Sequence, residues 1–521
     1  MSLNFSAQGN KSTFAAKQAL HDSLLAANAP LLAKQCLQET NWRANYYQHF
    51  LHLNAAMLKS PHLCLHASIA GLASLRSTFQ FDRLLLSQVE NRPPVTPPLS
   101  TTVVHGQGSS QPFTCPMDKK EHNLTSLTQK IQSLVERGAA EPSVLTSVQR
   151  LAQHPEWLSK KELSSFTFAV LGAGSQMGPT KALLRMGATV LAIDLKGRDD
   201  MWDRLSEYAR HTPGTLVIPM SHVDGTAVDS STSIRGCDIL SDFESISRWI
   251  VEQSFHKRIV IGGFLYADGA LFARIAVAAD AVIQAVCHIR ADTALISLCS
   301  PTEVFSVPKA ANQEATRRYH SLNVHTPWER TIGLVSNQRY LQQNTPRVVT
   351  ADNGRDTFLL QDSQVWQQGP NYAFAKLIQR WRNVVAREQG QHWVSSNVAP
   401  ASLTKSVMSN SLIRAGMLGC QFFGIVPFEP GTSNSLMTAL AIHDLRCTGS
   451  SANPTTVLKN PLDLFIENAV HGGTWRCAYV TNSYTEVSAA LYGLKVVAPY
   501  VAVAVGASYW KRNAGSTTSR L

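Results

Sequence analysis

The chain has 521 residues, of which 44% are hydrophobic and 16% are charged. This length exceeds one ordinary core and predicts two or three domains, and the balance of residue types excludes a disordered chain. The net charge of +11 would suit nucleic acid, an anionic membrane or anionic substrates, but no basic run or nucleic-acid motif accompanies it, which argues against nucleic-acid binding. Nine scattered cysteines without a C-x-x-C pair argue against a disulfide framework or a zinc site, and for a reducing compartment.

Residues 1–160 are predicted to form a mostly helical N-terminal region. Apolar positions recur at helical spacing on both sides of a Pro-rich break near residues 91–113, which contains four prolines in six residues and is expected to be a linker or an irregular crossing. The aromatic and histidine side chains here, such as Tyr46 and His49, fit packed helix faces better than ligands. No chemistry is assigned to this region.

The stretch "SSFTFAVLGAGSQMGPTKALLRMGATVLAIDL" predicts a strand, a glycine turn, a helix that opens near Met177, and a second strand. Glycines let the backbone approach a pyrophosphate, and the helix N-terminus offers positive dipole and free N–H donors. Asp194 ends the second strand, where a carboxylate accepts hydrogen bonds from an adenosine ribose. The alternative is a tight turn that binds no ligand. The predicted cofactor-binding residues of this unit are Gly172, Gly174, Ser175, Met177, Gly178 and Asp194.

Strands and helices continue to alternate after this unit, with strands expected over 215–221, 257–269 and 293–301. The alternation predicts an α/β fold, a Rossmann-like doubly wound parallel sheet preceded by the mostly helical N-terminal region, with a ligand at the carboxyl edge of the strands. We expect this domain to span residues 164–487.

The pentapeptide "YAFAK" carries Tyr372 and Lys376 on one helix face, because residues four apart lie on the same side of a helix. A cation beside the phenol should lower the pKa of Tyr372 toward neutrality and make it a general acid or base. The segment "QHWVSSNVAPASLTKSV" follows. With the glycine turn, this order resembles the short-chain dehydrogenase/reductase superfamily, over residues 164 to about 450.

The resemblance implies catalytic roles for Tyr372, Lys376 and Ser300, the last as the oxyanion donor. It also implies that Lys376 holds the nicotinamide ribose and that Pro400 belongs to the cofactor site. The cofactor is expected to be NAD or NADP, with NAD favoured because the carboxylate of Asp194 repels a 2′-phosphate. Ser300 lies more than seventy residues before the tyrosine, which implies an insertion near residues 302–368 that should shape the substrate pocket.

This sequence departs from the family pattern in several places. Gln176 replaces the middle glycine of the turn, and the family's proton-relay asparagine is missing. We expect an NAD(P)-dependent oxidoreductase that acts on a carbonyl/alcohol substrate. The departures keep open a dinucleotide-binding pseudoenzyme or scaffold without turnover, and a membrane-associated structural protein is a further alternative. A homo-oligomer is compatible with all three.

The C-terminal residues 488–521 combine an apolar segment with a tail. Residues 488–510 are long and apolar enough to be a membrane-span candidate, but Lys495 and Pro499 interrupt them, so a buried element of the last domain is favoured. The terminal Ser519-Arg520-Leu521 resembles a peroxisomal address. It predicts a peroxisome or a related microbody such as a glycosome, an import receptor as partner, and an acyl-CoA or lipid-derived substrate; a cytoplasmic location is the alternative.

Overall fold

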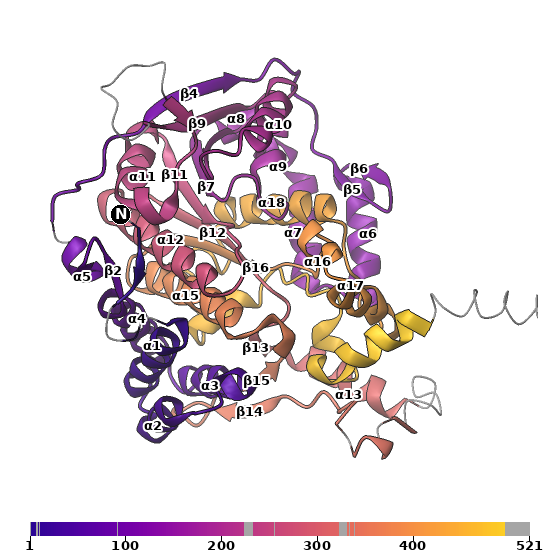
Figure 1. The fold of residues 1–521 in the computed structure, drawn as a ribbon. Coiled ribbons are helices and arrows are strands. Elements are labelled where there is room, and N and C mark those ends of the chain that lie inside the picture. Colours follow the sequence, from indigo (N-terminus) through magenta and orange to yellow (C-terminus); the bar gives the residue numbers. More distant parts are fainter. Residues whose placement is uncertain are drawn as a thin grey trace, which may run out of the picture.

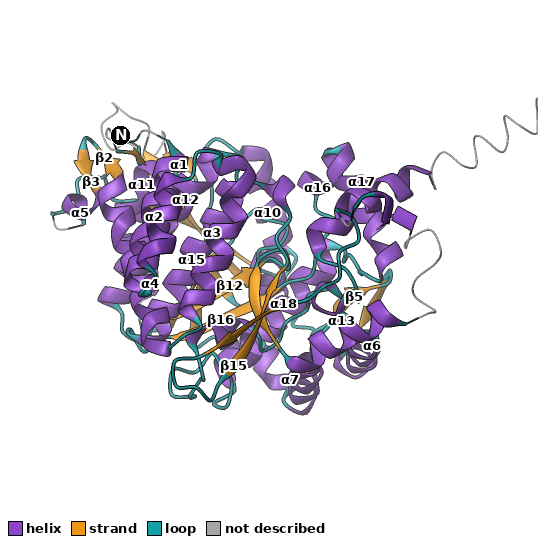
Figure 2. Cartoon of the chain, turned by 90° about the horizontal axis from the view of Figure 1, so that it is seen from below, coloured by secondary structure: helices purple, strands orange, loops and turns teal. Residues whose placement is uncertain are grey.

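A sheet of eight strands runs through the middle of the protein, with helices against both of its faces (Figure 1). The architecture is mixed α/β, as the alternation along the chain predicts. Figure 2 shows the same arrangement after a quarter turn, with strands enclosed by helices. The computed structural model describes residues 2–6, 9, 11–90, 92–222, 233–254, 256–321, 331–332, 334–337 and 339–494.

Six neighbouring strands of the sheet are parallel, in the order β9-β8-β7-β11-β12-β16. The strands β10 and β4 both pair with β9 in the antiparallel direction, so the sheet is mixed. Because β7 is the first of the six parallel strands along the chain yet lies among them, the chain runs outward to β9 and then continues on the other side of β7. The strands are β4 (Ser100–His105), β7 (Phe166–Leu171), β8 (Thr189–Ile193), β9 (Thr215–His222), β10 (Ser233–Arg235), β11 (Arg258–Gly263), β12 (Ala294–Cys299) and β16 (Trp393–Val398).

Alternate residues of the parallel strands point into two hydrophobic cores. On β7, Ala169 and Leu171 belong to one core, and Phe168 and Val170 belong to the other. The first core contains α11 (Ile239–Ser254), α12 (Ala270–Ile289) and α15 (Pro370–Glu388), and the second contains α6 (Leu124–Glu136), α7 (Pro142–Gln153), α9 (Thr180–Arg185), α10 (Asp199–Arg210) and α18 (Pro430–Arg446). Of the described helices, α12 alone is long and apolar enough to cross a membrane, but most of it is buried in this core.

The N-terminal helices pack against the sheet domain. They are α1 (Ser12–Ala26), α2 (Pro30–Gln38), α3 (Trp42–Met57) and α4 (Pro61–Thr78). Arg76 of α4 donates to Asp280 Oδ2 of α12 at 2.5 Å, and Arg382 of α15 donates to Asp280 Oδ1 at 2.6 Å. A carboxylate that is only 2% exposed therefore ties three helices together, one of them from the N-terminal region.

The Pro-rich break near residues 91–113, for which the sequence predicts a linker or an irregular crossing, takes part in the central sheet. It contains β4, which extends the central sheet through six paired positions along β9. The reason is physical, since β9 would otherwise present unpaired backbone groups along that edge. The smaller elements of the first 163 residues are β1 (Asn4–Phe5), β2 (Phe79–Phe81), β3 (Leu84–Leu85), α5 (Leu86–Val89), β5 (Cys115–Met117), β6 (Lys120–His122), η1 (Pro155–Leu158) and α8 (Lys160–Leu163).

The predicted insertion near residues 302–368 forms a small antiparallel sheet of its own, in the order β13-β15-β14. Its elements are β13 (Val304–Val307), α13 (Lys309–His320), β14 (Arg347–Thr350), β15 (Thr357–Asp362) and η3 (Trp366–Gln368). It leads directly into α15, so it lies between the end of β12 and the helix that carries the predicted catalytic pair.

The remaining C-terminal elements are short helices, namely α16 (Lys405–Ser409), α17 (Ser411–Gly419), η4 (Cys420–Phe423), η5 (Pro461–Phe465), η6 (Thr474–Arg476) and a helix over 481–494. The last helix runs through residue 488, where the sequence analysis places the start of the C-terminal segment. Val487 and Ser488 are both buried. Most of the apolar segment 488–510 and all of Ser519-Arg520-Leu521 lie outside the described residues.

Candidate functional site

The glycine turn follows β7 directly, at the carboxyl edge of the parallel strands. Gly172 has a φ of +89°, a conformation that favours glycine, and its N–H donates to Ile193 O at 2.8 Å. A Cβ at this position would lie 2.9 Å from backbone atoms of Phe264 and Leu265. Both conformation and space therefore exclude a side chain here, as expected for a turn built on backbone contacts.

Asp194 meets this turn from the end of β8. Its Oδ2 accepts a hydrogen bond from Gly174 N at 2.7 Å, and its Oδ1 accepts one from Leu195 N at 2.8 Å. The structure therefore places Asp194 beside the turn, with both carboxylate oxygens hydrogen-bonded to backbone N–H groups. The carboxylate lies at the sheet edge, with one oxygen bound to the backbone of the turn itself.

The helix after the turn begins later than predicted. Gly178 N donates to Ser175 O at 3.2 Å, so the turn continues, and α9 starts at Thr180 rather than near Met177. The helix has only six residues. A Cβ at Gly178 would come no closer than 3.4 Å to its neighbours, so space does not require this glycine.

The loop after β16 lies against the glycine turn. Lys405 N donates to Gln176 Oε1 at 2.8 Å, so the side chain that replaces a glycine of the resembled family holds this loop. Pro400 is buried in the same loop, and Ser402 Oγ donates to its carbonyl oxygen at 2.9 Å. The structure thus brings the Pro400 loop and the glycine turn together.

A cleft of about 280 Å³, counting its open part, lies beside this turn and is named the turn cleft. Its lining includes Met177, Phe264, Leu298, Ser395 and Asn397, from the turn and from the ends of three parallel strands. No charged side chain is among its described lining residues, whose polar groups are hydroxyls and an amide. The enclosed part of the cleft has room for about one water molecule, so a ring-sized ligand would require it to widen.

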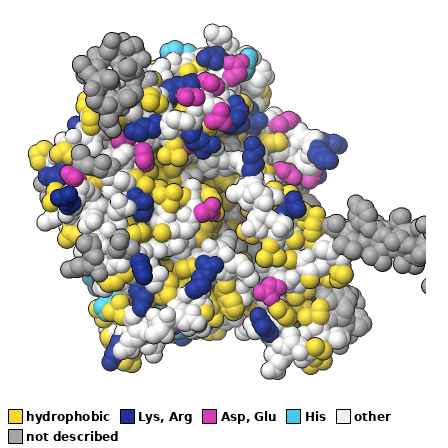
Figure 3. Space-filling view, viewed as in Figure 1, with side chains coloured by type: hydrophobic (Ala, Val, Ile, Leu, Met, Phe, Trp, Pro, Cys, Tyr) yellow, Lys and Arg dark blue, Asp and Glu magenta, His cyan; other side chains and the backbone are white. Residues whose placement is uncertain are grey.

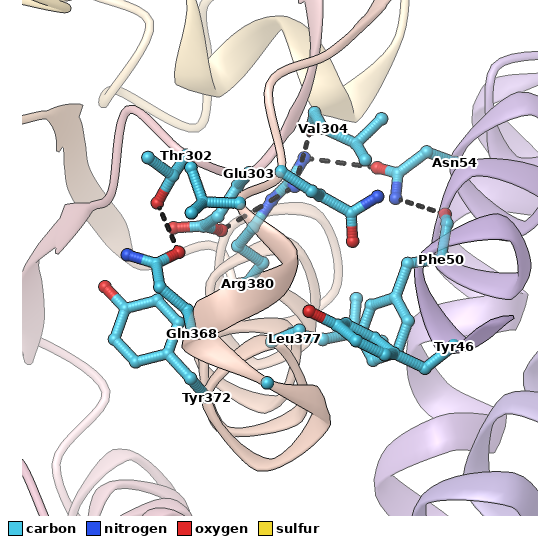
Figure 4. A pocket seen from close by; sticks show the side chains of 14 residues that line it. Tyr46, Phe50, Asn54, Thr302, Glu303, Val304, Gln368, Tyr372, Leu377 and Arg380 are labelled. Carbon is cyan, nitrogen blue, oxygen red and sulfur yellow. Dashed lines mark hydrogen bonds and ion pairs between the residues drawn. The ribbon is translucent and has the colours of Figure 1, made fainter. Parts of the chain in front are cut away.

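Ser300 and Tyr372 meet at the end of β12. Ser300 follows that strand directly, and its side chain lies close enough to the phenol of Tyr372, in the first turn of α15, to lower the pKa of that phenol. Ser300 Oγ lies 2.6 Å from Thr302 Oγ1. Figure 4 shows the next bond, in which Thr302 Oγ1 donates to Gln368 Oε1 at 2.7 Å. The structure therefore brings together two predicted catalytic residues that are more than seventy positions apart in the chain.

Lys376 lies one helical turn after Tyr372 and binds the carboxyl end of the sheet. Its Nζ donates to Leu298 O at 2.6 Å and to Gln379 Oε1 at 3.0 Å. Gln379 in turn donates to Gly263 O at 2.9 Å. Lys376 and Gln379 therefore join α15 to the ends of β12 and β11.

Burial raises the pKa of Tyr372 well above its usual value, so the predicted lowering toward neutrality is wrong. The nearby side chain of Ser300 opposes this rise, and the negative charge of Glu303 adds to it. The phenol ring packs against Phe272 of α12 at a centroid distance of 5.7 Å. Desolvation by distant parts of the chain outweighs any effect of the nearby cation, whose ammonium group is bound to Leu298 O.

A second cleft, named the tyrosine cleft, contains about 410 Å³ of empty space including its open mouth. Figure 4 shows its lining side chains, which come from α3, the insertion and α15. They include Tyr46, Asn54, Glu303, Gln368, Tyr372 and Arg380. The insertion therefore helps to shape a pocket beside Tyr372, and Tyr46, interpreted from sequence only as helix packing, also lines it.

Glu303 and Arg380 are functional-site candidates that the sequence analysis missed. Glu303 Oε1 accepts a hydrogen bond from Ser300 N at 2.6 Å, and its Oε2 lies 3.8 Å from Arg380 Nη1. Arg380 also donates to Val304 O at 2.8 Å and to Asn54 Oδ1 at 3.3 Å. Arg380 follows Lys376 by four residues on α15, a spacing that could have marked it, whereas nothing in the sequence marks Glu303.

The glycine turn and Tyr372 line different clefts, although they lie at the same edge of the sheet. Only β11 separates β7 from β12, so their ends are about 10 Å apart. Leu298 lines the turn cleft, and its carbonyl accepts a hydrogen bond from Lys376, one helical turn after Tyr372. Neither of the two described clefts contains both the turn and the phenol.

Comparisons with known proteins give no further assignment. No family model matches the chain, and no curated protein or solved structure matches it. Among the described residues, no group of three or more His, Cys, Asp or Glu side chains is arranged to hold a metal ion.

Proposed function

We propose that the protein is an NAD(P)-dependent oxidoreductase that interconverts a carbonyl and an alcohol. The observation that carries the proposal is the proximity of Ser300 and Tyr372 at the same sheet edge as the glycine turn and Asp194. In this account Ser300 donates to the substrate oxygen, and Tyr372 transfers the proton to or from it. A nicotinamide cofactor would supply or accept the hydride.

The strand order supports a Rossmann-like doubly wound domain of short-chain dehydrogenase type. Numbered along the chain, the parallel strands run 3-2-1-4-5-6, with the switch between β7 and β11. Ligands of such sheets bind outside the carboxyl ends at the switch point, and Gly172 lies there against Phe264 and Leu265. Ser300 after the fifth strand and Pro400 after the sixth follow the order that the resemblance implies.

The residues at the turn fit a dinucleotide, and the carboxylate favours NAD. Gly172 lets the turn lie against the backbone of Phe264 and Leu265, and Asp194 lies beside the turn, where an adenosine ribose would lie in this account. A 2′-phosphate would be repelled by Asp194. Lys196 lies two residues after Asp194, and its Nζ is 4.0 Å from Asp242 Oδ2. A cation at this position would attract a 2′-phosphate, so NADP is the second candidate.

Tyr372→Phe tests the catalytic assignment, because it removes only the phenolic O–H. We expect turnover on a carbonyl panel with NADH and NADPH to fall by roughly 10²–10⁴-fold, while cofactor binding and melting temperature are retained. Tyr46→Phe is the matched control, since that hydroxyl lines the same cleft and donates to Trp366 O at 3.3 Å. Full activity of Tyr372→Phe on a verified substrate would contradict the proposal.

A dinucleotide-binding protein without turnover is the second candidate. Two observations favour it, the raised pKa of Tyr372 and the separation of its cleft from the turn cleft. If this candidate is correct, the protein binds NADH but reduces no carbonyl compound in the panel. The microbody location remains a prediction that either function accommodates.

A further inference from the structure

The strand β4 forms an open edge of the central sheet. It pairs with β9 on one side, and Figure 1 shows it at the outer rim of the sheet. Strands of a sheet bond through backbone groups on both of their sides. An edge strand therefore offers a row of N–H and C=O groups with which another strand can pair.

The hydrogen bond after the end of β4 identifies the backbone groups that face outward. Gly106 N donates to Gly214 O at 2.8 Å, in register with the ladder between β4 and β9. Facing residues of an antiparallel pair are hydrogen-bonded at alternate positions only. Thr101, Val103 and His105 occupy the other positions, so their N–H and C=O groups point away from β9.

The opposite residue on β9 agrees with this assignment. Pro219 lies opposite Thr101 and has no N–H to donate to β4. Its carbonyl accepts a hydrogen bond from Gly236 N at 2.8 Å, beside β10 rather than β4. Among the described residues, none hydrogen-bonds to the outward groups of Thr101, Val103 and His105. Within this part of the chain, the outer edge of β4 is unpaired.

The side chains of β4 favour contact with another strand. The strand reads "STTVVH" and carries no Lys, Arg, Asp or Glu, although charged side chains commonly protect an edge strand from pairing. Val103 is 43% exposed, whereas Val217, opposite on β9, is buried. A β-branched apolar side chain in the middle of an open edge stabilises pairing with a strand of the same kind.

We propose that two copies of the chain pair through β4, antiparallel and about a two-fold axis at Val103. In this register Val103 lies opposite Val103 of the partner subunit, and Thr101 lies opposite the partner subunit's His105. Only this register pairs all three outward residues of one copy with all three of the other. The two central sheets then form one continuous sheet across the dimer.

The surroundings of β4 favour a second copy over a peptide. Peptides that add a strand to a sheet are selected by pockets for alternate side chains, and neither the turn cleft nor the tyrosine cleft includes a residue of β4. Helices flank the strand on opposite faces of the sheet. Trp249 Nε1 of α11 donates to Thr101 Oγ1 at 2.9 Å, and Gln107 N donates to Arg210 O of α10 at 2.9 Å. A stable interface buries about 1,200–2,000 Å², and these helices add to the area that the strands bury.

The charges near β4 allow two copies to approach each other. Arg210 Nη1 of α10 lies 2.8 Å from Glu207 Oε2. Arg235 Nη2 of β10 lies 2.8 Å from Asp203 Oδ1 of α10. Figure 3 shows acidic and basic side chains interspersed in this upper part of the molecule. A surface that mixes both signs does not repel its own copy, as a patch of one sign would.

The oligomeric state of the full chain tests the inference independently of the proposed oxidoreductase activity. We expect sedimentation equilibrium at micromolar concentration to show a dimer. Val103→Pro removes the central outward N–H but none that pairs with β9, so it should weaken the dimer by about tenfold or more. Val103→Lys should also weaken it, because like charges then meet on the axis. Melting temperatures verify that both variants are folded.

Val348→Pro is the matched control. Val348 is 63% exposed in β14, which is an edge strand of the small sheet. Ala351 N donates to Asp356 O at 2.9 Å in register with β14 and β15, so by the same alternation the N–H of Val348 points outward. This variant places the same substitution at an equivalent position of another edge and should dimerise like the wild type.

Val103→Cys tests the register of the dimer. The Cα atoms of a hydrogen-bonded antiparallel pair are about 5.5 Å apart, which a disulfide can bridge. Oxidised glutathione should therefore produce a covalent dimer on denaturing gels, whereas Val348→Cys should remain monomeric there. A dimer in which Val103→Cys gives no disulfide would overturn the two-fold register. A monomeric wild type, or a dimer that both Val103→Pro and Val103→Lys leave intact, would overturn the inference.

Discussion

The glycine turn and the Ser300–Tyr372 cluster lie at one edge of the sheet but are assembled in opposite ways. The turn and Asp194 come from one continuous strand-turn-helix-strand stretch, and their contacts are mainly backbone hydrogen bonds. The tyrosine cluster is assembled from α3, β12, the insertion and α15, and each of its contacts involves at least one side chain. A local motif therefore determines the geometry of the first region, whereas distant packing determines the electrostatics of the second.

Asp280→Asn tests how strongly the tyrosine region depends on distant packing. The change leaves Arg76 and Arg382 without their shared buried counter-charge, so we expect the free energy of unfolding to fall by about 3–5 kcal/mol in urea titrations. The exposed Asp200→Asn on α10 is the control and should leave stability unchanged. A loss below about 1 kcal/mol would mean that the N-terminal helices are not fixed to α15 through this cluster.

Substitutions of two glycines test whether the backbone of the glycine turn itself determines the geometry of that region. Gly172→Ala should cost about 2–4 kcal/mol of stability, because the alanine must adopt a φ of +89° and meet the backbone of Phe264 and Leu265. Gly178→Ala has room for its Cβ and should change stability by less than about 1 kcal/mol. Equal losses for the two variants would show that the turn is not specified by Gly172.

Local structure was the part that the sequence could predict. The buried strand β7, the glycine turn and Asp194 lie within thirty residues, so spacing alone relates them. The helix start at Thr180 was not predictable, because the turn's own hydrogen bonds delay it.

Long-range structure was beyond the sequence patterns. The pairing of β4 with β9 joins segments more than one hundred residues apart, and the prolines before β4 indicate only a break. The raised pKa of Tyr372 depends first on its burial, in which Phe272 of α12 takes part. The lining of the tyrosine cleft by Tyr46 depends on the docking of α3, which helical periodicity does not specify.

Acid should destabilise the protein through His471 and its partners. Burial holds the pKa of His471 below its usual value, although its hydrogen bond to Glu141 opposes this. Gly473 N donates to His471 Nδ1 at 3.1 Å, so the neutral ring donates through Nε2 to Glu141. Below about pH 6.5 the unfolded chain therefore binds more protons than the folded protein does. As the pH is lowered, His471 then reduces the free energy of unfolding by up to about 1.4 kcal/mol per pH unit.

Glu141 extends the same trend to lower pH. Burial alone would raise its pKa, but His471 and Arg476 together hold the pKa below its usual value. Its contribution is therefore present above the unfolded pKa and is lost as pH falls through the folded value. Urea titrations at several values between pH 5 and 7 give the free energy of unfolding as a function of pH. This free energy should depend less on pH in His471→Gln than in the wild type, whereas the exposed His211→Gln should have the pH dependence of the wild type. The same pH dependence of unfolding in all three proteins would contradict a contribution from His471.

The most direct test of the central claim is titration of NADH and NADPH against the wild type and Asp194→Ala. If the carboxylate accepts a hydrogen bond from the adenosine ribose, the variant should lose about 1.5–3 kcal/mol of NADH binding. NADPH binding should weaken less or improve, because the repulsion of a 2′-phosphate is removed. NADPH also serves as the internal control, since damage to the turn itself, through the lost bond to Gly174, would weaken both. Equal loss for the two dinucleotides, or a wild type that binds neither, would contradict a dinucleotide site at this turn.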